Sequence, residues 1–153
     1  MTHWFVQWTE KQVKKFRENS DFMMDCIGSN STTWKKNAKR NDIVWVHSNI
    51  SGSHYLLGKM KLESLHTPED TEEIIGRKLV TGKRYNEYWI NMWEWEVMRE
   101  IEMKDNFAFE INFLPINPLK EGYMSTQRLR TPQNISSVDH SKILDYWNSN
   151  IEN

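Results

Sequence analysis

Aromatic side chains are the first feature of this sequence that could carry chemistry. The chain holds 8 Trp, 6 Phe and 5 Tyr, although its mean hydropathy of −0.77 is that of a polar protein. A buried indole needs a hydrogen-bond partner, so a small core accommodates many Trp rings with difficulty. Flat rings can instead form a surface that stacks on a nucleobase. The sequence alone leaves both uses open.

Lysine and arginine are concentrated in two short segments that contain no acidic residue, 26–41 and 77–84. The basic residues there are Lys35, Lys36, Lys39, Arg40, Arg77, Lys78, Lys83 and Arg84. Cations next to flat rings suit nucleic-acid binding, in which the cations contact phosphates and a ring stacks on an unpaired base. A solvated surface face is the alternative, so this pattern indicates a nucleic-acid partner without requiring one.

The sequence lacks the motifs that carry common catalytic chemistry. It contains no glycine-rich phosphate loop, no nucleophile elbow and no His-Glu-x-x-His pair. The histidines are scattered without the spacing of metal ligands; they are His3, His47, His54, His66 and His140. Cys26 stands among apolar residues, so we expect a small buried side chain rather than a nucleophile. We therefore predict a non-catalytic protein with no metal and no cofactor.

Length and charge balance narrow the class of protein further. The chain has 153 residues, the usual size of one domain, and we expect a single domain over residues 1–153. Its formal net charge of −1 excludes a globally basic chromatin-type protein. Apolar runs reach only four or five residues, too short for a membrane span. Because no signal peptide is visible, we expect a cytoplasmic protein without a membrane partner.

The elements that would position these residues follow from local patterns. Aromatic and β-branched runs predict strands at 3–8, 42–48, 55–65, 88–103 and 107–113. Thr9 and Gln12 predict a capping box at a helix start, and Thr67-Pro68 begins a helix that ends near Gly76. Further helices are expected at 33–40 and 138–147, while 114–136 has the composition of a loop. This order predicts an α+β domain around a small barrel or curled sheet.

Four short segments resemble EVE and YTH domains, which are branches of the PUA-like superfamily. Asn41-Asp42-Ile-Val-Trp-Val-His-Ser48 resembles the turn and strand of EVE domains that end in His-Ser. Ser51-Gly-Ser-His-Tyr-Leu-Leu-Gly-Lys-Met60 resembles the Gly-Ser-Gly-His-Phe hairpin of YTH domains. Gln127-Arg-Leu-Arg-Thr-Pro132 is similar to the closing Arg-x-Leu segment of both, and Trp89-Ile-Asn-Met-Trp93 lies where YTH domains place cage tryptophans.

The resemblance implies a PUA-like twisted β-barrel of about five or six strands with short flanking helices. It also implies a pocket for one modified base that is flipped out of its helix. YTH domains bind N6-methyladenine in an aromatic cage, and EVE domains are linked to modified cytosines. In bacteria and archaea such domains often stand at the front of modification-dependent restriction enzymes, so a fused or associated nuclease or NTPase is an implied partner.

On this resemblance we select candidate residues for each part of the site. The pocket rings are Trp34, Trp89 and Trp93, and the polar contacts to the base edge are Ser29, Asn30 and Ser48. The phosphate contacts are Lys35, Lys36, Arg40, Arg77, Lys78, Arg84, Arg128 and Arg130. Two departures bear on specificity. Ile27 precedes Gly28-Ser29 where YTH domains have their first cage Trp, and Gly28-Ser29-Asn30 replaces the Arg-Asn of EVE domains. Methyladenine specificity and a three-ring cage therefore stay open.

We expect a reader domain for a flipped, methylated base in DNA, with RNA as the second choice. One alternative is a PUA-like RNA-binding module without modification specificity. Another is a protein-interaction domain that uses residues 85–121, which carry eight acidic residues against three basic ones. Affinity that falls steeply as salt rises would separate nucleic-acid binding from protein binding.

Overall fold

The computed structural model describes residues 1–18, 23–80, 84–104 and 131–151, together with the backbone of three short strands between 113 and 124. The helices are α1 Glu10–Glu18, α2 Thr32–Asn37, α3 Pro68–Ile75 and α5 Ser137–Ile151. The strands are β1 His3–Gln7, β2 Cys26–Ile27, β3 Ile43–Ile50, β4 Ser53–His66, β5 Tyr88–Asn91, β6 Ile101–Glu102, β7 Phe113–Leu114, β8 Leu119–Lys120, β9 Tyr123–Met124 and β10 Gln133–Ile135.

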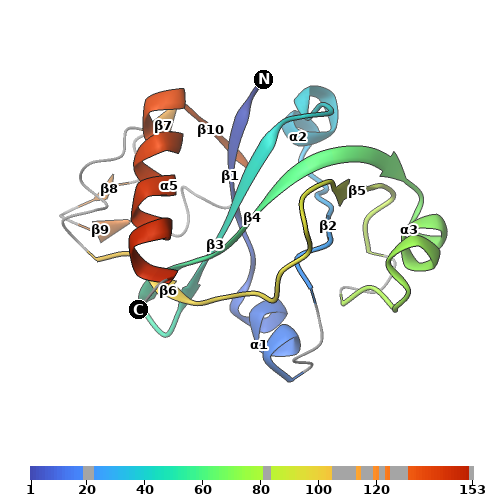
Figure 1. The fold of residues 1–153 in the computed structure, drawn as a ribbon, viewed down its shortest axis with the longest axis horizontal. Helices are drawn as coiled ribbons and strands as arrows, with labels where there is room; N and C mark the ends of the chain where they lie inside the picture. Colours follow the sequence, from blue (N-terminus) through green and yellow to red (C-terminus); the bar gives the residue numbers. More distant parts are fainter. Residues whose placement is uncertain are drawn as a thin grey trace.

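A mixed, curved sheet forms the body of the protein (Figure 1). Its strand order is β2-β5-β4-β3-β1-β10-β7, and β6 pairs with β4 beside this path. β1 runs parallel to β3, and the other pairings of these strands are antiparallel. The predicted α+β class is confirmed. The sheet has 8 strands rather than five or six, and the described pairings leave it open between β2 and β7.

The long strand β4 joins two parts of the sheet. Near the hairpin it pairs with β3 and β6, and toward His66 it pairs with β5. Figure 1 shows α5 beside one part of the sheet, and α2 and α3 near the other. The edge strand β2 pairs with β5, and β5 pairs with the end of β4 near His66, so this end of β4 connects β2 and β5 to the rest of the sheet.

Local sequence signals set the helix ends. Thr9 Oγ1 accepts from the Gln12 backbone N–H at 3.2 Å, and Gln12 Oε1 accepts from the Thr9 N–H at 2.9 Å, so the predicted capping box is confirmed. Thr67 caps α3, Pro68 is its first residue, and Gly76 ends it with a φ of 76°. This left-handed conformation favours glycine. None of the helices in the described residues is long and apolar enough to span a membrane.

Two apolar layers lie on opposite faces of the central strands. Side chains alternate across a strand, so Trp4 packs on one face while Phe5 and Trp45 pack on the other. α5 covers the second face with Ile143 and Trp147. Trp4, Trp45 and Trp147 are 0%, 0% and 2% exposed, so the core absorbs a large part of the aromatic surplus.

The predicted strand over 88–103 is wrong beyond Asn91. The Asn91 side chain accepts from the backbone N–H groups of Lys61 and Trp93 at 2.9 and 3.0 Å, and donates to Met24 O at 2.9 Å. These bonds turn the chain out of the sheet; a single bridge joins Val97 to Met23, and the next strand is β6. In the segment predicted as loop, Gln133–Ile135 forms β10 against β1. The predicted strand at 107–113 lies outside the described residues except for its end in β7.

Candidate nucleic-acid interface

The predicted site residues converge on one edge of the sheet. β2 pairs with β5 so that Ile27 lies opposite Trp89. We call residues 25–36, 77–80 and 84–91 the β2–β5 edge. From distant parts of the sequence it gathers most of the candidates, namely Ser29, Asn30, Trp34, Lys35, Lys36, Arg77, Lys78, Arg84 and Trp89. Gly28 and Ser29 line two different hollows, one on each side of the ladder.

The first hollow is lined by predicted residues but is very shallow. Ser29, Trp34, Lys35 and Trp89 surround about 20 Å³, room for one water molecule. Trp34 is only 3% exposed, and its ring packs edge-on against the Trp4 ring at 5.1 Å between centroids. The structure therefore brings Trp34 and Trp89 together with Ser29, but it places most of Trp34 in the core rather than on an open wall.

The second hollow, which we call the aromatic slot, is lined by rings that the sequence analysis missed. Trp8 and Phe16 stack at 4.8 Å and 23° on one side. Tyr85 and Tyr88 lie 5.6 Å apart on the other. The slot encloses about 30 Å³ as it stands, enough for one or two water molecules. The sequence signal that could have found it is the Tyr-x-x-Tyr spacing directly after the basic segment 77–84.

Gly28 lets the aromatic slot close. A Cβ at this position would lie 2.8 Å from Tyr85 Cδ2 and 3.0 Å from both Glu87 O and Tyr88 Cδ1. Such distances are shorter than normal van der Waals contacts, and one of these atoms belongs to the backbone. The absence of a side chain therefore allows both tyrosines to lie against β2, which also explains why a small residue follows Ile27.

A buried ion pair supports the wall of the slot. Arg77 Nη2 and Nε donate to Asp25 Oδ1 and Oδ2 at 2.6 and 3.2 Å. Burial raises the pKa of Asp25, and the Arg77 charge partly opposes that shift. Burial and the neighbouring Asp25 raise the pKa of the Cys26 thiol, which therefore stays protonated. Cys26 is a buried residue as predicted, and Arg77 holds a carboxylate rather than presenting an open cation.

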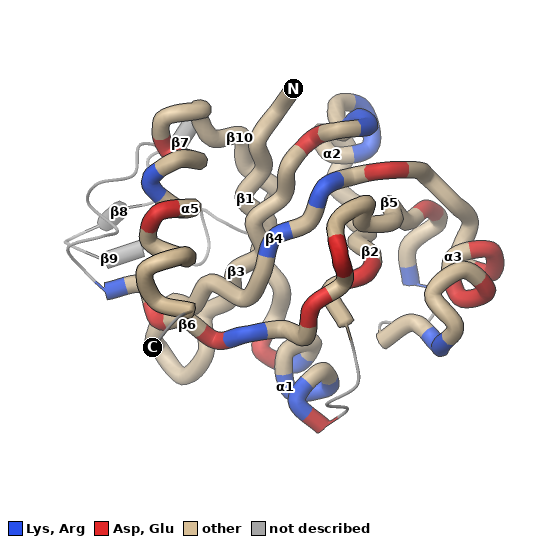
Figure 2. The backbone as a smooth tube through the Cα atoms, viewed as in Figure 1, with Lys and Arg blue, Asp and Glu red and all other residues tan. Residues whose placement is uncertain are grey.

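Exposed cations flank this edge on two sides. Lys35 and Lys36 lie on α2, while Lys78 and Arg84 precede β5, and all four are exposed. Figure 2 shows the blue positions of α2 and of the segment after α3 around the β2–β5 unit. The Arg84 guanidinium carbon lies 5.8 Å from the Tyr85 ring centroid. Cations and a half-buried ring therefore occur side by side, as a phosphate-and-base contact requires.

The remaining candidates lie elsewhere. Trp93 lines a separate groove beside α5. Ser48 is fully buried and donates to Trp8 O at 2.8 Å, so its hydroxyl supports the core beneath the slot. Arg40 lines an open hollow with Lys39 near the start of β1. Arg128 and Arg130 lie outside the described residues.

Within the described part of the chain, no three His, Cys, Asp or Glu side chains gather closely enough to hold a metal ion. Four of the histidines instead lie against other rings. His47 Nδ1 lies 3.1 Å from His54 Nε2 inside the core, and His3 stacks on His140 at 4.3 Å between centroids. Burial lowers the pKa of His54 to about 4 and also lowers that of His47. These residues are neutral structural groups at pH 7.

No protein-family model matches this chain, and no curated protein matches its sequence. Among solved structures, it is similar to the human THYN1 protein, whose crystal structure is a complex with DNA containing 5-methylcytosine. That likeness has a TM-score of 0.49 at 10% sequence identity, and it covers 95% of this chain and 96% of the THYN1 chain.

Proposed function

We propose that this chain is a non-catalytic reader that binds a modified base flipped from DNA at the β2–β5 edge. The observation that carries the proposal is the convergence of the aromatic slot with exposed cations. The slot brings together rings from α1, β5 and the segment before it, and Lys35, Lys36, Lys78 and Arg84 surround the same edge.

The lining of the aromatic slot suits a methylated base. Tyr85 offers a flat face, and base–aromatic stacking contributes about 1–3 kcal/mol per base. Ile27 and Leu79 offer apolar contact to a methyl group, and the Gln12 amide nitrogen offers a donor to the base edge, while Gln12 Oε1 accepts from Thr9 in the capping box. A base with an unmatched polar edge would leave a group unpaired, at a cost of about 1–3 kcal/mol. This combination favours discrimination between modified and unmodified bases.

Base binding requires the aromatic slot to open. Its present volume of about 30 Å³ holds water but not a base. Tyr85 is the half-buried member of the four rings, and its ring lies against Gly28. We infer that Tyr85 swings away from Gly28 when a base enters and then stacks on it. Trp8 and Phe16 are 7% and 8% exposed, so they would form the fixed wall.

A reader of this kind supplies recognition and no bond cleavage. The edge presents no metal-ligating triad in the described residues, and the Cys26 thiol stays protonated. On this proposal, cutting of modified DNA comes from a fused or associated nuclease, and the chain is the specificity module of a modification-dependent restriction system.

The test is a binding panel measured on the intact chain. Single- and double-stranded oligonucleotides of DNA and RNA would carry plain, methylated or hydroxymethylated adenine and cytosine. Tighter binding to one modified DNA than to its plain counterpart supports the proposal. Equal affinity for modified and plain strands contradicts it, and an RNA preference that ignores methylation favours the PUA-like RNA-binding alternative. Absence of oligonucleotide binding at low salt contradicts both and favours a protein partner.

A further inference from the structure

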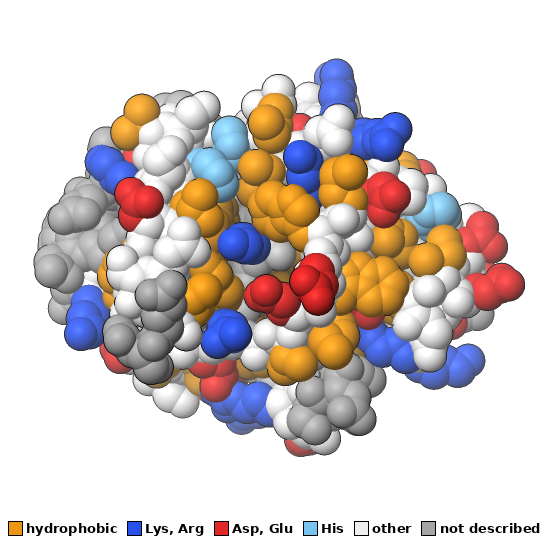
Figure 3. Space-filling model, viewed as in Figure 1, with side chains coloured by type: hydrophobic (Ala, Val, Ile, Leu, Met, Phe, Trp, Pro, Cys, Tyr) orange, Lys and Arg blue, Asp and Glu red, His pale blue; other side chains and the backbone are white. Residues whose placement is uncertain are grey.

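A large groove lies remote from the aromatic slot. It encloses about 440 Å³ between α5 and the segment 93–97, and it shares no lining residue with either hollow of the β2–β5 edge. Figure 3 shows it as a depression among hydrophobic side chains with a basic side chain inside. Its volume lies in the range of small-molecule sites, which are mostly apolar with a few polar groups.

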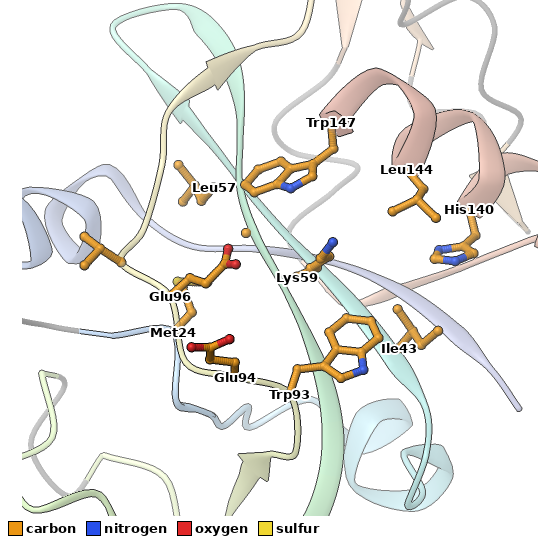
Figure 4. Close-up of a pocket in the computed structure, with 12 residues that line it drawn as sticks. Met24, Ile43, Leu57, Lys59, Trp93, Glu94, Glu96, His140, Leu144 and Trp147 are labelled. Atoms are coloured by element: carbon orange, nitrogen blue, oxygen red, sulfur yellow. The ribbon is translucent and has the colours of Figure 1, made fainter. Parts of the chain in front are cut away.

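One buried donor in this groove has no acceptor. Trp147 is 2% exposed, and its indole Nε1 makes no hydrogen bond with the described residues. The ring lines the groove, and its nitrogen faces the side of the hollow where Lys59 lies (Figure 4). A buried N–H group without an acceptor is destabilising. An oxygen acceptor bound in the groove would supply the missing bond once the neighbouring side chains move aside, because the nitrogen itself is buried.

The same side of the groove carries a cation and a second donor. Lys59 Nζ lies 5.7 Å from the Trp93 ring centroid. His140 Nδ1 accepts from the Trp45 indole N–H at 3.0 Å, so neutral His140 carries its proton on Nε2. Burial, with smaller effects from His3 and Lys59, lowers the pKa of His140 to about 4. This side therefore favours an acceptor such as a carboxylate.

The facing side carries negative charge. Glu94 and Glu96 line the groove from the segment across from α5 (Figure 4), and both are exposed. Two carboxylates at the mouth disfavour a phosphate or a simple carboxylic acid, because like charges repel. They favour a ligand that also carries an ammonium group. Leu57, Leu144 and Val97 supply apolar surface between the two charged sides.

We propose that this groove binds a free amino acid with an apolar side chain. Its carboxylate would accept from Trp147 Nε1 and pair with Lys59, and its ammonium group would face Glu94 and Glu96. The apolar side chain would lie against Leu57 and Leu144. The basic side and the acidic side of the groove together favour a small molecule that carries both charges. Such a ligand differs from the nucleic acid proposed for the β2–β5 edge.

The test follows the indole N–H signals of the ¹⁵N-labelled intact chain by NMR during titration with three related probes. L-phenylalanine carries both charges, phenethylamine lacks the carboxylate, and 3-phenylpropionate lacks the ammonium group. We expect L-phenylalanine to shift the Trp147 signal, which is assigned by its loss in Trp147→Phe. Each single-charge probe should bind about tenfold more weakly, because a hydrogen bond to a charged group is lost. L-leucine should behave like L-phenylalanine.

Lys59→Met provides a variant that keeps the aliphatic stem. It should weaken L-phenylalanine binding about tenfold, while Lys61→Met, two residues along β4 and outside the groove lining, should leave binding unchanged. Equal binding of 3-phenylpropionate and L-phenylalanine overturns the proposal. So does the absence of a saturable Trp147 shift up to about 10 mM probe, which would populate even a millimolar site. In that case the groove holds water alone.

Discussion

Arg77 donates hydrogen bonds to both carboxylate oxygens of Asp25, although the two residues are 52 positions apart in the sequence. The side chains are 16% and 3% exposed, so water screens the pair weakly. This contact ties the segment after α3 to β2 and fixes one wall of the aromatic slot. Arg77, which the sequence analysis selected as a phosphate contact, therefore has a structural role.

Arg77→Met should destabilise the fold by about 3–5 kcal/mol at pH 7, because it leaves a buried carboxylate without its partner. Asp25 has a raised pKa in the folded chain, and loss of Arg77 raises it further. Protonation then removes the unpaired charge, so the deficit should shrink as pH falls from 7 toward 5. Urea unfolding at both pH values measures this change. The control is Asp25→Asn with Arg77→Met, which should recover part of the stability; an equal deficit in both variants contradicts the pairing argument.

Gly28→Ala should cost more stability than Gly58→Ala, although both glycines lie in or beside strands. At Gly28 the new Cβ meets the Glu87 carbonyl oxygen at 3.0 Å as well as two tyrosine rings, so backbone must move. At Gly58 the nearest atoms, from 2.9 Å, all belong to the Met24 side chain, which is flexible. We expect a loss of about 1–3 kcal/mol for Gly28→Ala and less for Gly58→Ala in thermal or urea unfolding. Equal losses of stability in the two variants would contradict the close packing of backbone against Gly28.

Acid should destabilise the fold below pH 6.5 through the buried histidines. Burial lowers the pKa of His54 to about 4, so the unfolded chain binds a proton at pH 5 that the folded chain does not. A group with a lowered folded pKa stabilises above its unfolded pKa and loses that contribution as pH falls. From His54 alone the loss is about 2 kcal/mol between pH 7 and pH 5. The free energy of unfolding, measured at pH 7 and pH 5, should drop less between these values in His54→Gln than in the original chain. An equal drop in both contradicts the role given to His54.

Features that depend on neighbouring residues were predictable from the sequence. The Thr9–Gln12 capping box and the Thr67 cap with Gly76 at the end of α3 depend on side chains within a few residues. The α+β class follows from such local patterns as well. The end of β5 at Asn91 was not predictable, because it depends on hydrogen bonds to Lys61 and Met24, which are distant in the sequence.

The roles of the tryptophans depend on packing that composition does not reveal. Trp34 has the helix position and the neighbouring lysines of a surface ring, yet it packs edge-on against Trp4 of β1 in the core. Lys35 and Arg84 lie in separate basic segments, and the β2–β5 pairing brings these segments to the same edge. Tyr85 was missed because its contact with Gly28 joins two loops.

The two kinds of contact at the β2–β5 edge should respond differently to substitution. Arg84→Gln removes an exposed cation, so it should weaken binding to modified and plain DNA equally. It should also reduce the slope of log K against log salt by about 0.9 for a duplex or 0.7 for a single strand. Tyr85→Ala removes a stacking ring of the slot, so it should abolish the preference for modified DNA and leave the salt slope unchanged. Fluorescence anisotropy at several salt concentrations measures both quantities.

Two further variants control this experiment and locate the base. Lys142→Gln alters α5, beside the other part of the sheet, and should change neither quantity (Figure 1). Trp89→Ala removes a ring on the opposite side of the same ladder, so the preference for modified DNA should survive. If Trp89→Ala abolishes the preference and Tyr85→Ala does not, the base binds in the shallow hollow beside Trp34, and the aromatic slot is a structural feature. Both rings lie beside the β2–β5 pairing, so each substitution could also destabilise these strands. Unfolding measurements on each variant show whether a change in binding comes from the missing ring or from a destabilised β2–β5 edge.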